Sequence, residues 1–319
     1  MSTSPAVTVI VPGFDVAAFA EEALESLRAQ TRPDWTAILV DDASSDATGA
    51  LFETAATADA RFRVIRHDRR RGLGAARNSA LDAVDTPFVA FLDADDLLAP
   101  GALESLVTEV DESGSDFAVG AYVRLRPDAA GGYTAGEVQP WVRAATRPAL
   151  RGVTIDEHPD ATANVVAWSK VSRAAFWART GLRFPEGRLY EDQVVAQLMY
   201  THARAFDVVS DVVVHWRQRA DGTSITQTED RIDVLRDCLA AMEDGLRVLE
   251  GTDHPLAARA RIRQMLGMDV PRLAGIAAGH PDDGYRRALG AFARGLWERG
   301  AAPDLEHEAA VAVAAARLW

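Results

Sequence analysis

Apolar runs alternate with segments of helical spacing from Ala6 to Val123. The runs are rich in Val, Ile and Phe and are bounded by polar clusters, which predicts strands, at Val7–Val11, Trp35–Asp41, Arg63–Arg66, Phe88–Leu92 and Phe117–Val123. The segments between them predict helices at Ala17–Ala29, Asp46–Ala58, Gly74–Val84 and Pro100–Glu112. Alternating strands and helices are typical of a mostly parallel sheet with right-handed crossovers. We therefore predict an α/β fold with a central sheet flanked by helices.

The pattern changes twice in the remainder of the chain. From Arg124 to about Asp160 a Pro- and Gly-containing stretch predicts a surface excursion over the crevice beyond the carboxyl ends of the strands. Order then returns as a strand, two helices and an extended segment interrupted near Ser210, predicted at Val165–Val171, Arg173–Arg179, Glu191–His202 and Ala205–Trp216. Beyond Glu229 the spacing is helical, at Arg231–Leu249, Leu256–Ala278, Asp283–Arg299 and Leu305–Leu318. We accordingly predict an α/β domain over residues 1–228 and a helical accessory region over residues 229–319.

The most informative stretch is the end of the run Phe88–Leu92, which passes directly into Asp93, Asp95 and Asp96. Carboxylates crowded at the end of a buried strand repel one another, and a divalent cation is the simplest way to hold them together. Mg²⁺ and Mn²⁺ prefer hard oxygen ligands and can bridge two phosphates, so we predict that Asp95 binds such an ion directly. Asp93 is predicted to contact the ion or a ribose. The alternative is that these residues only cap the helix beginning near Pro100, for which one aspartate would suffice.

Other polar residues should converge on the same place. In a parallel sheet, ligands bind beyond the carboxyl ends of the strands, where Pro12, Asp41 and Asp42 also emerge. Either Asp41 or Asp42 could accept a hydrogen bond from a uracil imide or a ribose hydroxyl, although an Asx turn would also explain them. The segment Gly72–Asn78 follows the third strand, not the first, which disfavours a dinucleotide-binding dehydrogenase. Arg77, on the opening turn of a helix, could reach a base or a diphosphate, or could be a solvated surface arginine.

Composition excludes several classes of function. The net charge of −13 argues against broad binding to nucleic acid or anionic lipid, because both require clustered positive charge. Cys238 is the single cysteine, so no internal disulfide or cysteine-based zinc site can form, which fits a reducing cytoplasm. We find neither an N-terminal leader pattern nor an apolar stretch approaching roughly 18 residues. We therefore expect no transmembrane segment and a cytoplasmic location, with peripheral contact to the inner face of the membrane left open.

Four motifs occurring in order carry a resemblance to a known family. They are Val9–Pro12, Val40–Asp46, Gly72–Asn78 and Asp93–Asp96, and together they resemble the family 2 glycosyltransferases of GT-A fold. The resemblance extends over roughly Ala6 to Thr226. It implies an inverting sugar transferase that uses a nucleotide-sugar donor, usually a UDP-sugar, with Mn²⁺ or Mg²⁺. The implied acceptor is a glycan, a polyol-phosphate polymer or a lipid-linked saccharide of the cell wall or cell surface.

The resemblance also assigns roles to individual residues. Asp41 would contact the base of the nucleotide, and Asp96 would face the sugar or orient the site. A sugar hydroxyl is too weakly acidic to attack efficiently without losing its proton, so a base is needed. The sequence Tyr190-Glu191-Asp192 resembles the Glu-Asp motif of this family, which makes Asp192 the predicted base and Glu191 a residue that orients a substrate. The alternative is that both acids merely stabilise the N-terminus of the following helix.

A second group resembles the mobile lid of transferases that modify wall polymers. In that resemblance Arg219 and Ser224 fold over the diphosphate, with Arg217 in reserve for the same role. A guanidinium in a closed site would stabilise the charge that develops on the departing nucleotide. His215 could complete the metal shell, although a lone histidine after a strand is more often structural.

Two other functions remain open at this point. A metal-dependent nucleotidyl or phosphoryl transferase would also use clustered aspartates, but it should carry a phosphate-binding Gly-Lys loop, which we do not find. A catalytically silent nucleotide-sugar-binding protein could have the same fold. The C-terminal helices could bind a polymer, form a homo-oligomer or simply pack on the core.

Overall fold

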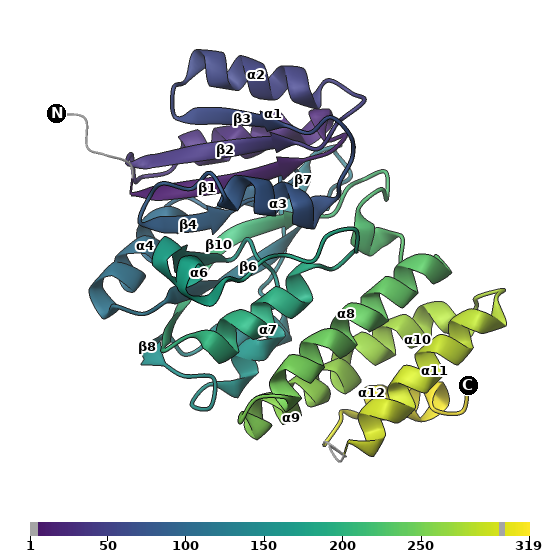
Figure 1. Ribbon diagram of the computed structural model, residues 1–319. Coiled ribbons are helices and arrows are strands. Elements are labelled where there is room, and N and C mark those ends of the chain that lie inside the picture. Colours follow the sequence, from purple (N-terminus) through teal and green to yellow (C-terminus); the bar gives the residue numbers. More distant parts are fainter. Residues whose placement is uncertain (1–5, 300–303) are drawn as a thin grey trace.

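A computed structural model describes residues 6–299 and 304–319 of the chain. Its centre is one mixed sheet with the strand order β3-β2-β1-β4-β9-β6-β10-β5. Helices cover both faces of this sheet, and the C-terminal helices lie together on one side of it (Figure 1). The strands are β1 Val7–Gly13, β2 Trp35–Asp41, β3 Phe62–Arg66, β4 Phe88–Phe91, β5 Leu97–Leu98, β6 Phe117–Pro127, β7 Tyr133–Ala135, β8 Leu150–Val153, β9 Lys170–Arg173 and β10 Phe206–Arg217.

The helices of the α/β part follow the predicted spacing closely. They are α1 Ala17–Arg28, α2 Thr48–Ala58, α3 Leu73–Leu81, α4 Ala102–Ser113, α5 Pro140–Thr146, α6 Ala174–Thr180 and α7 Asp192–His202, with the short 3₁₀ turns η1 Pro159–Ala163 and η2 Ile225–Gln227. β1 pairs in parallel with both β2 and β4. Every residue of β1, β2 and β4 is buried, which explains their nearly continuous apolar sequence. The predicted parallel half of the sheet is therefore confirmed.

The prediction of a strand at Val165–Val171 is wrong in its bounds. It also does not say whether this strand runs parallel or antiparallel to its neighbours. β9 begins only at Lys170 and runs antiparallel to both β4 and β6. The residues before it are tied by side-chain hydrogen bonds instead, because the buried Lys170 donates to the carbonyls of Asn164 at 2.9 Å and Val166 at 2.6 Å. The sheet is mixed at this point, since β9 runs against both of its neighbours.

The excursion after Arg124 lies only partly at the surface. It contains two short strands that were not predicted, of which β7 pairs with the end of β6 and β8 pairs with β10. Val142 and Ala145 of α5 are fully buried. Apolar residues spaced within this Pro- and Gly-rich stretch therefore contribute to the core.

The helical region is α8 Ile232–Glu250, α9 Pro255–Gln264, α10 Val270–Ala278, α11 Asp283–Glu298 and α12 His307–Ala316. A π-helical turn, η3 Met265–Asp269, joins α9 to α10, so the predicted helix Leu256–Ala278 is continuous but irregular. Leu246 and Leu249 of α8 belong to the same hydrophobic cluster as the sheet, whereas Leu235 and Leu273 belong to a second cluster within the helices. Within the described residues, none of the helices combines the length and the apolar character that crossing a bilayer would require.

Replacing Gly74 with alanine should destabilise the protein. A Cβ atom at this position of α3 would lie 2.1 Å from the carbonyl oxygen of Pro185, and backbone cannot move aside as a flexible side chain can. We expect Gly74→Ala to lower the free energy of unfolding by about 1–3 kcal/mol, measured by equilibrium unfolding in urea.

Gly275→Ala is the matched control, because Gly275 is also helical but has no atom within 4 Å of the added Cβ position. It should raise the free energy of unfolding by up to about 1 kcal/mol through helix propensity alone. Equal stability of the two variants would contradict the close packing of α3 on the segment at Pro185.

Candidate active site

The carboxyl ends of β1, β2 and β4 are joined by backbone hydrogen bonds that place three motifs side by side. The carbonyl of Pro12 accepts from the amide of Ala94 at 3.4 Å, and the carbonyl of Gly13 accepts from the amide of Asp42 at 3.0 Å. Pro12 itself is buried. The structure thus brings together the predicted Pro12, Asp41, Asp42 and Asp93 regions at one edge of the sheet.

Asp41 and Asp42 serve the surrounding loops in this structure. Asp42 accepts from the amides of Gly72 at 2.7 Å and Arg71 at 2.9 Å, and its carboxylate lies 2.6 Å from Nδ1 of His67. Asp41 accepts from the amide of Ser44 at 2.9 Å, as an Asx turn does, and its buried Oδ2 is paired with the guanidinium of Arg66 at 3.3 Å. Asp42 is therefore an anchor for the loop before α3, and Asp41 is held by a turn and an ion pair.

Arg77 links the two acidic motifs of the chain. It is buried, and its guanidinium donates 2.7 Å to Asp93 after β4 and also binds Glu191 before α7. The nearby ring of Phe184 lies 5.2 Å from the guanidinium carbon. The negative charges of Asp93, Glu191 and Asp192 raise the pKa of Arg77. Arg77 is thus neither a surface residue nor free to bind a diphosphate, since it holds together carboxylates that lie far apart in the sequence.

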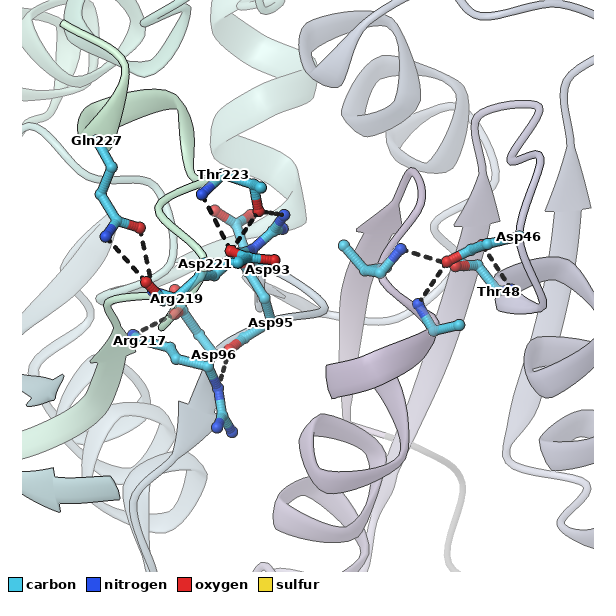
Figure 2. A network of polar contacts seen from close by, with 12 residues as sticks. Asp46, Thr48, Asp93, Asp95, Asp96, Arg217, Arg219, Asp221, Thr223 and Gln227 are labelled. Atoms are coloured by element: carbon cyan, nitrogen blue, oxygen red, sulfur yellow. Dashed lines mark hydrogen bonds and ion pairs between the residues drawn. The ribbon is translucent and has the colours of Figure 1, made fainter. Parts of the chain in front are cut away.

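The acidic cluster after β4 is contacted by two further arginines, both from the end of β10 and the segment after it (Figure 2). Arg219 forms a two-pronged ion pair with one oxygen of Asp95, at 2.9 and 2.8 Å. The backbone amide of Arg217 donates to Asp96 at 2.7 Å, and its guanidinium donates to the carbonyl of Asp95 at 2.7 Å. A simple helix cap does not describe this cluster, because the partners of these aspartates, Arg217 and Arg219, come from a distant part of the chain.

Burial and mutual repulsion affect the protonation of these aspartates. Burial raises the pKa of Asp96 well above its ordinary value, and the charges of Asp95 and Asp93 add to that effect. Burial likewise raises the pKa of Asp95, although Arg219 opposes the shift. The arginines therefore do not fully offset the burial and mutual repulsion of these carboxylates, which favours an additional cation.

The segment after β10 is tied to itself by side-chain hydrogen bonds. Gln227 binds both the amide and the carbonyl of Arg219, at 3.1 and 3.0 Å, and Thr223 accepts from the Arg219 guanidinium at 3.2 Å (Figure 2). The hydroxyl of Ser224 is buried without a hydrogen bond among the described residues. Arg219 and Ser224 thus lie on one compact turn, which is attached to the acidic cluster through Arg219 and Asp95.

Arg217 has different surroundings from those expected of a reserve phosphate ligand. It is buried, donates to Glu22 of α1 at 2.6 Å, and its guanidinium carbon lies 4.4 Å from the ring centre of Tyr133 and 5.3 Å from that of Phe19. Sequence reasoning missed these partners, because nothing local marks Glu22 or Tyr133 as belonging to the site. Arg217 fastens β10, α1 and β7 around the cluster.

Asp192 begins α7 and has no side-chain hydrogen bond among the described residues. Burial raises the pKa of its carboxyl group, while the positive charges of Arg77 and Lys170 oppose the shift. Burial also raises the pKa of Glu191 to about 7, against the opposing charge of Arg77. One arginine therefore faces three carboxylates, and Asp192 is the one that it does not bind directly.

A divalent metal fits this site only together with a ligand. Over residues 6–299 and 304–319, no three His, Cys, Asp or Glu side chains are grouped so that they could hold an ion by themselves. His215 therefore does not complete a protein-only shell with the aspartates, and burial lowers the pKa of His215. Asp93 and Asp95 each use one oxygen for an arginine, and no hydrogen bond in the described chain occupies the other. Such a pair suits Mg²⁺ or Mn²⁺, which are often bound by one or two carboxylates with substrate phosphates and water.

Comparison with known proteins finds a match to one family model and a similar fold. A family model described as "Glycosyl transferase family 2" matches residues 8–160. Among curated proteins, the chain is 30% identical over 226 residues to the putative glycosyltransferase EpsH of Bacillus subtilis, covering 67% of this chain and 61% of EpsH. It is 28% identical over 285 residues to glycosyltransferase GlyA of Streptococcus pneumoniae, covering 86% of this chain and 39% of GlyA. The chain thus spans less than two thirds of either relative.

A solved structure resembles the whole arrangement. The crystal structure of S. aureus TarS 1-349 in complex with UDP-GlcNAc matches with a TM-score of 0.72, over 92% of this chain and 82% of that one. The two sequences are 21% identical in this match, so the likeness is one of fold. It confirms the predicted α/β architecture with its C-terminal helices.

Removing the charge of Arg77 should destabilise the protein strongly. Arg77→Met would leave Glu191 and Asp93 buried without their counterion, and breaking one partner of a buried ion pair costs about 3–5 kcal/mol. We expect a loss of that size in the free energy of unfolding at neutral pH, measured by denaturant titration. The loss should shrink as pH falls, because protonation of the two orphaned carboxyl groups removes the uncompensated charge.

Arg183→Met provides the control. Arg183 also pairs with a carboxylate, that of Asp82 at 2.8 Å, but both side chains are largely exposed. Its removal should change the free energy of unfolding by less than about 1 kcal/mol. A similar small loss in Arg77→Met would show that Arg77 does not hold the two acidic motifs together.

Proposed function

We propose that this chain transfers a sugar from a UDP-sugar to a hydroxyl acceptor with inversion of the anomeric carbon, because residues 8–160 match the model of glycosyl transferase family 2 and the fold is similar to that of TarS. The transferred group would be a hexosyl or N-acetylhexosaminyl residue. The acceptor would be a glycan or glycoconjugate of the cell surface.

One observation carries this proposal. Arg77 holds Asp93, at the start of the acidic cluster, and Glu191, next to the unpaired Asp192, on the same guanidinium. A charged cluster suited to a metal and a diphosphate thereby lies close to a carboxylate suited to accept a proton. This is the arrangement that a single in-line displacement needs, with the leaving group on one side and the base on the other.

The donor would lie against the carboxyl ends of β1, β2 and β4. Asp41 lies at the carboxyl end of β2, paired in register with Gly13 of β1, and this position supports its assignment to the base or ribose. Asp93 and Asp95 would hold Mg²⁺ or Mn²⁺ through their remaining oxygens, and the ion would neutralise part of the diphosphate charge. TarS, which has the same fold, is described in complex with UDP-GlcNAc, and this supports UDP as the nucleotide.

The protein's own groups would act on the acceptor and the leaving group. Asp192 would accept the proton of the attacking hydroxyl, which makes that oxygen a stronger nucleophile. Glu191, fixed by Arg77, would position the neighbouring base. Arg219 lies on the turn over the cluster, and its guanidinium could move from Asp95 to the departing diphosphate, where it would stabilise developing negative charge.

Asp192→Asn should retain donor binding and lose transfer. The amide cannot accept the proton, and positioned general bases contribute roughly 10²–10⁴-fold to rate. We expect a loss of that size in product formation, measured with a radiolabelled donor, with an unchanged donor Kd. In the wild type, the rate should decline on acidification already above the usual carboxyl range, because burial raises the pKa of Asp192 and only the ionised form acts as a base.

Asp233→Asn is the control for the alternative that Asp192 only stabilises the N-terminus of its helix. Asp233 occupies the first turn of α8 and is exposed. The same substitution there should leave transfer unchanged. Full transfer by Asp192→Asn would reject the assignment of the base.

A thermal-shift screen of nucleotide sugars with and without Mn²⁺ tests the proposal as a whole. A ligand that binds only the folded state raises the melting temperature, so we expect a UDP-sugar to raise it more in the presence of Mn²⁺. Asp95→Asn should lose the part of the shift that depends on Mn²⁺, whereas Asp211→Asn, an exposed change on β10, should keep it. Absence of any shift by UDP-sugars in the wild type would refute the proposed donor.

A further inference from the structure

Arg124 is a partly buried cation without an acidic partner. It lies near the end of β6, and its guanidinium carbon is 5.5 Å from the ring centre of Trp141 and 5.3 Å from that of Trp216. Its Nε is buried, and no hydrogen bond or ion pair to its side chain exists within the described residues. The mechanism described above does not use it.

The other arginines around the site are paired. Arg77 binds Asp93 and Glu191, Arg217 binds Glu22, and Arg219 binds Asp95. Burying part of a charge without a partner is unfavourable, and proteins normally satisfy such a group. Stacking on tryptophan rings recovers only about 0.5–2 kcal/mol. The guanidinium of Arg124 therefore has hydrogen-bonding capacity that no described residue uses.

The two tryptophans beside Arg124 provide a surface suited to a sugar. Trp141 and Trp216 are only half-buried, and the indole nitrogen of Trp141 donates to the hydroxyl of Tyr122 at 3.4 Å. The buried ring of Trp168 packs against both Tyr122 and Trp216, with ring centres 4.8 and 6.4 Å away. Aromatic rings with one accessible part and nearby polar groups are typical of small-ligand sites.

The position of this group relative to the donor site follows from the strand register. Arg124 pairs with Trp216 on the parallel strands β6 and β10, and Leu125 pairs with Arg217. Because successive side chains of a strand point to opposite faces, Arg124 and Trp216 lie on the face opposite to Arg217 and its partner Glu22. The arginine that fastens the acidic cluster is therefore on one face of the sheet and Arg124 on the other.

Tyr122 connects this group to the rest of the site. It lies two residues before Arg124 on β6, and so on the same face of the sheet, and its hydroxyl accepts from Trp141 at 3.4 Å. The helix α7, which Asp192 begins, packs on η1 through the hydrogen bond from Gln197 to the carbonyl of Thr162 at 3.0 Å. Burial raises the pKa of Tyr122 to about 12, the charge of Arg124 opposes this shift, and the charge of Asp192 increases it.

We propose that Arg124, Trp141 and Trp216 form an acceptor subsite for a glycan that carries an anionic group, a phosphate or a carboxylate, close to the sugar that is attacked. The inference rests on the proposed function, because it assumes that Asp192 receives the acceptor hydroxyl. Arginine is suited to this role since its planar fork can donate two hydrogen bonds to a phosphate or carboxylate while its face stacks on an aromatic ring. The anion would supply the partner that Arg124 lacks.

A cavity next to Trp141 gives the acceptor room to continue. It has a volume of about 230 Å³ and lies where α5, η1 and α9 meet, with Asp160, Arg263 and Gln264 in its wall. Neither Asp95 nor Asp192 lines it, so it is separate from the donor site. A saccharide stacked on Trp141 would extend into this cavity and so contact the C-terminal helical region.

Retention on an array of phosphorylated, carboxylated and neutral glycans tests the proposal. The wild type, loaded with UDP and Mn²⁺, should retain phosphorylated or carboxylated glycans over their neutral counterparts, and the phosphorylated and carboxylated sets identify which anion is used. Arg124→Gln should weaken that retention by roughly 10- to 100-fold, the equivalent of one charged hydrogen-bonded contact. Arg124→Lys, which keeps the charge but not the planar fork, should fall between the two.

Arg287→Gln on the outer helix α11 is the control for loss of one positive charge, because Arg287 is exposed. It should bind the array like the wild type. Thermal melting and the UDP-sugar shift should be retained in Arg124→Gln, which separates the subsite from folding and from the donor site. Equal retention of neutral and anionic glycans by the wild type, no retention of anionic glycans, or unchanged retention by Arg124→Gln would each overturn the proposal. Loss of the UDP-sugar shift in the wild type itself would refute the proposed function instead.

Discussion

The site depends on one buried guanidinium shared between carboxylates from two distant parts of the chain. Arg77 binds Asp93, which follows β4, and Glu191, which precedes α7. Without a central cation, Asp93, Glu191 and Asp192 would repel one another in a poorly solvated place. Burial raises the pKa of Asp192, and the charge of Arg77 opposes that shift. The interaction that assembles the site therefore also favours the ionised form of Asp192, the form that the proposed base requires.

Arginines organise the two sides of the crevice in different ways. On the side of α1, Arg217 is paired with Glu22 and Arg219 with Asp95. On the opposite face of the sheet, Arg124 rests against two tryptophans without an acidic partner among the described residues. Arg124 is free to bind a charged group directly, whereas Arg219 would first have to leave Asp95. This contrast is what separates a donor side from an acceptor side in our interpretation.

The C-terminal helices support the residues that flank the proposed base. Arg261 of α9 donates to Gln193, directly after Asp192, at 2.7 Å. Tyr190, which has a positive φ of 58°, donates to Glu229 at 3.0 Å, and Glu229 is paired with Arg272 from the start of α10. A non-glycine residue in this conformation costs about 1–3 kcal/mol and persists only where neighbours fix it. The helical region therefore does more than cover the core, since it holds both sides of the Glu191–Asp192 pair.

The sequence by itself determined the alternation of strands and helices, the parallel half of the sheet and the edge at which Asp41 and Asp93 emerge, because these follow from local hydrophobic periodicity and from chain direction. The motif resemblance also pointed to the family 2 glycosyltransferases and indicated Asp192 as a base and Arg219 as a lid residue. Only the tertiary structure decided that Arg77 binds two acids and that Asp42 anchors a loop. It alone revealed that β9 is antiparallel and that Arg124 lacks a partner. Each of these depends on which side chains from distant segments meet in a buried place, where desolvation makes pairing decisive, and local sequence patterns carry no record of such meetings.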